Sequence, residues 1–76
     1  MHLTIYKTSV ATQKQVQQLQ AQINKLPLIT HCNFDLDDCD RILRIISKDL
    51  QPQLICQLLH NKGFNCETME SFIYRH

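Results

Sequence analysis

The chain has no apolar run that approaches the ~20 residues a membrane-spanning helix needs. It also has no run of basic residues, and its formal net charge is only +1. Nucleic-acid binding relies on clustered Lys and Arg, so we expect neither a nucleic-acid nor a membrane partner. The N-terminal segment MHLTIYKTSV lacks the basic and apolar regions of a signal peptide, which predicts a cytoplasmic protein.

The sequence is also too short for more than one module. A chain of 76 residues buries only roughly 60% of its unfolded surface, which allows one small core. Its 43% hydrophobic and 20% charged residues are typical of a globular protein. We expect a single domain over residues 1–70 and a C-terminal tail over 71–76. The cytoplasmic address predicts that the four cysteines are free thiols rather than disulfides.

The central stretch, residues 28–46, indicates two strands joined by a tight turn. Cys32, Phe34 and Leu36 alternate with Asn33 and Asp35, as in a strand with one buried face, which predicts a strand over Ile29–Asp35. The segment 37–40, DDCD, favours a turn because Asp side chains accept hydrogen bonds from nearby backbone amides. Apolar residues, three of them β-branched isoleucines, predominate over Arg41–Ser47, which predicts a second strand.

Four further elements flank this hairpin: strands over His2–Lys7 and Phe64–Thr68, and helices over Thr12–Leu26 and Leu50–Lys62. Thr12 and Gln15 have the spacing of a capping box at the start of the first helix. Gly63 is typical of a left-handed helix cap after the second.

The predicted order is βαββαβ. Right-handed crossovers fold such a chain into an α+β ferredoxin-like sandwich, a four-stranded antiparallel sheet in the order 4-1-3-2 with both helices on one face. The loop after the first strand, the acidic turn and the loop before the last strand should then meet at one end. The residues predicted to form the core are Ile5, Val16, Leu19, Ile23, Cys32, Phe34, Leu43, Ile45, Ile55, Leu59 and Cys66.

The predicted core leaves a candidate contact surface on the sheet face away from the helices. Its residues are Tyr6, Ile42, Arg44 and Ile46. Large apolar groups on an uncovered face are typical of interaction sites.

Three short segments carry a resemblance to a known family. Leu26–Ile29 is similar to a Leu-Pro-Gly-Val step, Cys32–Leu36 to Val-x-Val-Asp-Leu, and Gly63–Cys66 to Gly-Tyr-x-Ala. Together they resemble the heavy-metal-associated domain of copper chaperones and metal-transporting ATPases. The resemblance covers most of the chain and implies the same ferredoxin-like fold.

That family binds metal through Gly-Met-x-Cys-x-x-Cys, which falls here on Ser9, Val10, Thr12 and Gln15. Thr12 and Gln15 stand at the two ligand positions, and neither side chain is the soft sulfur ligand that copper(I) prefers. The resemblance therefore implies a domain that has lost its metal site. We predict a non-enzymatic module without a cofactor or bound metal, which binds a protein partner or a second copy of itself.

Two alternatives remain open. Cys39 and His60 lie at the same predicted end of the molecule and could bind copper or zinc in a remodelled site. The topology is also that of ACT-type regulatory modules, which bind small molecules near a first loop that carries glycine, whereas Ser9–Ala11 contains none. No arrangement of residues indicates catalysis, so no catalytic residue is predicted.

Overall fold

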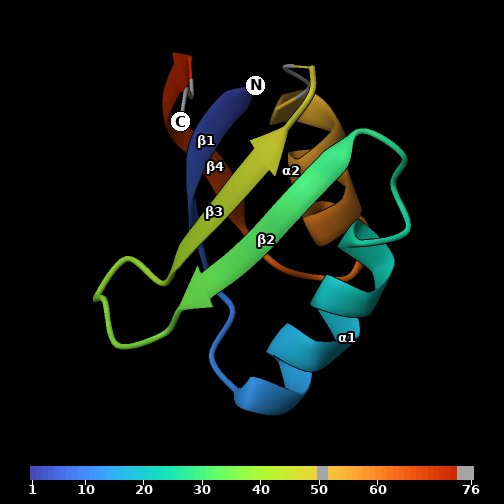
Figure 1. Ribbon diagram of the computed structural model, residues 1–76. Helices are drawn as coiled ribbons and strands as arrows, with labels where there is room; N and C mark the ends of the chain where they lie inside the picture. The colour runs from blue at the N-terminus through green and yellow to red at the C-terminus, as the bar shows by residue number, and fades with distance from the viewer. Residues whose placement is uncertain (50–51, 74–76) are drawn as a thin grey trace.

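The computed structural model describes residues 1–49 and 52–73. The elements in chain order are β1 (His2–Thr8), α1 (Gln13–Ile23), β2 (Ile29–Asp35), β3 (Ile42–Ser47), α2 (Pro52–Asn61) and β4 (Cys66–Ile73). The strands form one antiparallel sheet in the order β2-β3-β1-β4, and both helices cover the same face of it (Figure 1). The predicted ferredoxin-like fold is confirmed. In the described residues, neither helix is long and apolar enough to cross a membrane.

Local signals place the helix ends. Thr12 is the N-cap of α1, and its hydroxyl accepts a hydrogen bond from the Gln15 amide at 3.2 Å. α1 ends at Ile23, earlier than predicted, and the next residues continue as turns. After α2, Gly63 has a φ of 90°, so it adopts the left-handed cap that was predicted. The predicted start of this helix at Leu50 lies outside the described residues.

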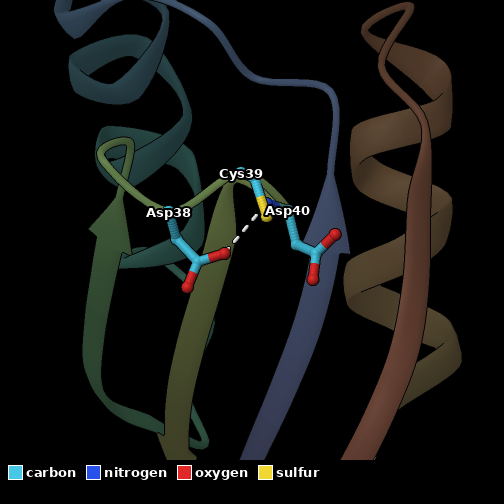
Figure 2. Close-up of side chains that lie close together, drawn as sticks. All are labelled: Asp38, Cys39 and Asp40. Atoms are coloured by element: carbon cyan, nitrogen blue, oxygen red, sulfur yellow. Dashed lines mark hydrogen bonds between the residues drawn. The ribbon is translucent and has the colours of Figure 1, made fainter.

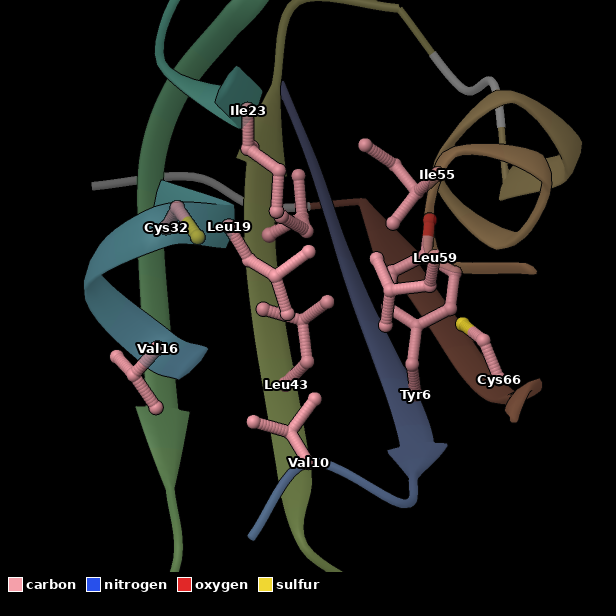
Figure 3. Packing of buried hydrophobic residues seen from close by; sticks show 11 residues of the cluster. Tyr6, Val10, Val16, Leu19, Ile23, Cys32, Leu43, Ile55, Leu59 and Cys66 are labelled. Atoms are coloured by element: carbon pink, nitrogen blue, oxygen red, sulfur yellow. The ribbon is translucent and has the colours of Figure 1, made fainter. Parts of the chain in front are cut away.

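The core lies between the sheet and the two helices. Its buried apolar cluster comprises Tyr6, Val10, Val16, Leu19, Ile23, Cys32, Leu43, Ile45, Ile55, Leu59 and Cys66 (Figure 3). All the predicted core residues belong to it except Ile5 and Phe34. Phe34 packs against the cluster but is only half-buried.

The prediction was wrong about which face of β1 is buried. Tyr6 is 1% exposed and belongs to the core, whereas Ile5 is only half-buried. Tyr6 pairs with Leu43 of β3, and directly opposed residues in an antiparallel pair share a face. Because β3 places Leu43 under the helices, the register carries Tyr6 there as well.

The last strand is longer than predicted. β4 continues to Ile73 and pairs with β1 from Thr8–Cys66 to His2–Ile73, with a register shift between Ile5 and Tyr6. Residues 71–73 are therefore part of the sheet rather than of a tail. The rest of the predicted tail, 74–76, lies outside the described residues.

Candidate functional site

Three loops meet at one end of the sheet, as the topology predicts. The Thr8 amide donates to the Asp40 carbonyl oxygen at 3.1 Å, and the Thr8 hydroxyl donates to the Arg41 carbonyl oxygen at 2.7 Å. The Ser9 amide donates to the Asn65 carbonyl oxygen at 3.2 Å. The β1–α1 loop, the acidic turn and the α2–β4 loop are therefore held together by backbone hydrogen bonds.

Within the β1–α1 loop, Thr12 and Gln15 are engaged in starting α1. The Gln15 side-chain oxygen accepts from the Ala11 amide at 2.9 Å and from the Thr12 amide at 3.1 Å. With the Thr12 hydroxyl accepting from Gln15, the capping box is complete. A hydroxyl and an amide that already make these bonds do not fit a soft metal ion, which prefers sulfur ligands.

The acidic turn between β2 and β3 gathers three potential metal ligands. Three potential ligand atoms lie within 4.8 Å of one another, one from each of Asp38, Cys39 and Asp40 (Figure 2). The Asp40 amide donates to the Asp38 carboxylate at 2.9 Å, and the Asp40 carboxylate lies 3.6 Å from the Lys7 ammonium. Both carboxylates therefore have partners within the protein, while the Cys39 thiol is exposed.

The two residues predicted as a remodelled metal site have different neighbours. Cys39 lies with the turn carboxylates, whereas His60 is an exposed residue of α2 that lines a shallow hollow with Cys66 and Glu67. A shared Cys39–His60 site stays a prediction.

A second group of sulfur atoms lies between α2 and β4, where the sequence indicated no site. The Cys66 thiol donates to the Cys56 sulfur at 3.2 Å, and the Cys56 sulfur lies 3.7 Å from the Thr68 hydroxyl. Burial, then the hydrogen bond and proximity to Cys56, raise the pKa of the Cys66 thiol. The ten-residue spacing gives no signal for this pair, because it depends on how a helix packs on a strand.

The sheet face opposite α1 and α2, which no described helix covers and which we call the uncovered face, carries a continuous apolar row. Register places Phe72 of β4, Leu3 of β1 and Ile46 of β3 side by side on this face. Phe72 is 47% exposed. We refer to these three residues as the apolar row.

Two of the four residues of the predicted contact surface are buried. Register keeps Ile42, Arg44 and Ile46 on the uncovered face, but Ile42 is 6% exposed and Tyr6 points into the core (Figure 3). Arg44 lies 3.9 Å from the Asp35 carboxylate on the same face.

A separate cavity lies at the opposite end of the sheet. It has a volume of about 240 Å³, and its mostly apolar lining includes Leu28, Ile45 and Leu54. Binding of a small regulatory molecule, the ACT-type alternative, stays a prediction.

No protein-family model and no curated protein matches the sequence. Solved structures do match. The yeast copper transporter domain Ccc2a, solved in solution in apo and Cu(I)-loaded states, shares 15% identity over 92% of this chain and 97% of its own, with a TM-score of 0.81. The solution structure of the Atx1–Cu(I)–Ccc2a complex matches with the same identity and coverage and a TM-score of 0.79. At 15% identity these likenesses show the fold alone: the chain has the fold of a copper-transporter domain.

Proposed function

We propose that this chain is a non-enzymatic domain of the heavy-metal-associated type that binds a protein through the uncovered face of its sheet. Three motifs of the sequence and the shared fold support the family. Ccc2a, a domain with this fold, is found in complex with a second protein, Atx1. Thr12 and Gln15 stand where the family resemblance implies thiolates, which supports a role in which binding a protein has replaced binding a metal.

The apolar row carries this proposal. Phe72, Leu3 and Ile46 adjoin one another on the sheet face opposite α1 and α2, which no helix of the described residues covers (Figure 1). Fully burying a side chain such as Phe is worth about 1.5–3 kcal/mol, so this row is a favourable contact surface. Contiguous apolar groups on an otherwise polar surface are typical of interfaces.

A second copy of the chain is the partner that we propose. Arg44 and Lys7 share the uncovered face with Asp35 and Glu70, so the face carries charges of both signs. Two copies related by a two-fold axis can set opposite charges against each other while burying the two apolar rows. The net charge of +1 gives little repulsion between copies.

Sedimentation from micromolar to millimolar concentration tests this proposal. We expect the wild-type chain to form dimers as its concentration rises and Phe72→Ser to remain monomeric. Leu54→Ser is the matched control, because Leu54 is similarly exposed, at 42%, but lies on α2. A wild-type chain that stays monomeric throughout, or a Phe72→Ser variant that dimerises equally well, contradicts the proposal.

The acidic turn supports a second candidate function, binding of a transition-metal ion. Zinc accepts cysteine sulfur and carboxylate oxygen, and both ligand types are gathered at Asp38, Cys39 and Asp40. Metal uptake by the reduced chain that is lost in Cys39→Ser would support this candidate. Uptake that is unchanged in Cys39→Ser would rule it out.

A further inference from the structure

The contact between Cys56 and Cys66 is unusual because it brings two thiols from different elements together at a partly accessible place. Cys56 lies on α2 and Cys66 is the first residue of β4, and their sulfur atoms are 3.2 Å apart. Cys66 is 9% exposed, but Cys56 is only half-buried, so solvent reaches the pair from the side of α2. The other two cysteines are not part of this group.

His60 lies one helical turn after Cys56, on the same side of α2. Residues four apart on a helix are neighbours, with Cβ atoms about 5–6 Å apart. His60 also lines the hollow that Cys66 lines, next to the start of β4. His60 and Cys66 therefore border one hollow, and Cys56 lies beside Cys66. The His60 side chain is exposed, and a change of its rotamer is needed to bring an imidazole nitrogen to the two sulfurs.

We propose that Cys56, Cys66 and His60 bind a zinc ion or a similar thiophilic divalent ion. This donor set, two sulfurs and one imidazole, is one that zinc accepts with a fourth position left for water or a partner's side chain. Two sulfurs bound at ~2.3 Å to a tetrahedral zinc are roughly 3.8 Å apart. The two sulfur atoms, now 3.2 Å apart, need to separate by roughly 0.6 Å to reach that geometry.

Binding releases the thiol protons to solvent. Each cysteine must be a thiolate to bind the ion, so zinc binding releases two thiol protons. The affinity for zinc therefore rises with pH. The site is separate from the acidic turn and from Thr12 and Gln15. It also goes beyond protein binding by the apolar row, since it lies at the α2–β4 contact rather than on the uncovered face.

Zinc titration of the reduced, metal-free 76-residue chain tests the site. We expect native mass spectrometry to show one zinc per chain after desalting, and Co²⁺ to give a near-ultraviolet thiolate charge-transfer band. Cys56→Ser should weaken zinc binding by at least about 100-fold, because a direct ligand matters more than the outer-shell groups worth 10–100-fold. His60→Ala should weaken it by at least about tenfold.

Cys32→Ala is the matched control, because Cys32 is a free thiol outside this group and outside the acidic turn. It should leave zinc affinity unchanged. Cys56 is preferred to Cys66 as the test position, since a half-buried residue tolerates serine better, and circular dichroism confirms that the variant is folded. The proposal is overturned if the wild-type chain retains no zinc, if folded Cys56→Ser binds as tightly as wild type, or if folded Cys32→Ala no longer binds zinc.

Discussion

Thr12 and Gln15 illustrate how two side chains define the start of a helix. Thr12→Ala removes the hydroxyl that accepts from the Gln15 amide. We expect the free energy of unfolding to fall by about 0.5–2 kcal/mol, the usual cost of losing an N-cap. Urea denaturation measures the loss. Thr12→Ser keeps the hydroxyl and should stay close to wild type, whereas an equal loss in both variants would show that the cap is not the cause.

Cys32 makes stability depend on pH in the alkaline range. Burial raises the pKa of Cys32 from 9.0 to about 12. The unfolded chain therefore loses this proton first, so the folded state is favoured below pH 9 and loses that advantage as pH rises from 9 to 12. Burial raises the pKa of Tyr6 and of Cys66 as well, so both groups act in the same direction.

Cys32→Ala provides the test of this pH dependence. The variant lacks the titrating thiol, so its free energy of unfolding should fall less between about pH 8 and about pH 10.5 than that of the wild type. The difference between the two pH values is compared, because it cancels any constant packing loss. Identical slopes in the two proteins would contradict the buried-thiol explanation.

At the scale of the element, α2 is stabilised by the stripe it buries. Leu59 is fully buried, whereas Leu54 on the same helix is 42% exposed. Leu59→Ala should cost about 2–5 kcal/mol and Leu54→Ala much less, because only the first leaves a cavity in the core. Thermal or chemical denaturation of both variants measures the difference. Similar losses would mean that the two residues are equally buried in solution.

Local sequence signals predict each element but not which face of β1 is buried. The acidic turn, the capping box and Gly63 are each read from a few neighbouring residues, and the structure confirms all three. In β1, both sets of alternating residues contain large side chains, so alternation alone does not decide. The pairing of Tyr6 with Leu43 determines which face of β1 is buried, and this pairing depends on β3, a distant segment of the chain.

Among the candidate sites too, some depend on neighbouring residues in the sequence and others on contacts between distant segments. The clustering of Asp38, Cys39 and Asp40 is local and visible in the sequence. The contact between Cys56 and Cys66 depends on the packing of α2 against β4, and the apolar row depends on β4 continuing to Phe72. Predicting the cysteine contact and the apolar row requires knowing how distant segments pack and pair, and no short sequence pattern gives this information.

At the scale of the whole molecule, β4 completes the sheet along all of β1. A chain that ends at Asn65 loses every β1–β4 pair and the Cys66 side chain next to Tyr6. We expect this truncated chain to be unfolded, since a domain of this size has little stability to spare. Circular dichroism should show loss of secondary structure. A chain that ends at Ile73 keeps the described pairs and serves as the control, and a folded 65-residue chain would contradict the prediction.

The central position of β1 has a consequence for how the protein is made in the cell. Of the described strands β1 is synthesised first and β4 last, yet β4 is one of the two neighbours of β1 in the sheet, and β3 is the other. At ~5–20 residues per second, roughly 3–13 s separate the synthesis of Thr8 from that of Ile73. During that interval one edge of β1 has no partner, and unpaired edges are where nascent chains aggregate. Lys7 lies on this strand, and a lysine at a strand edge disfavours pairing with another chain.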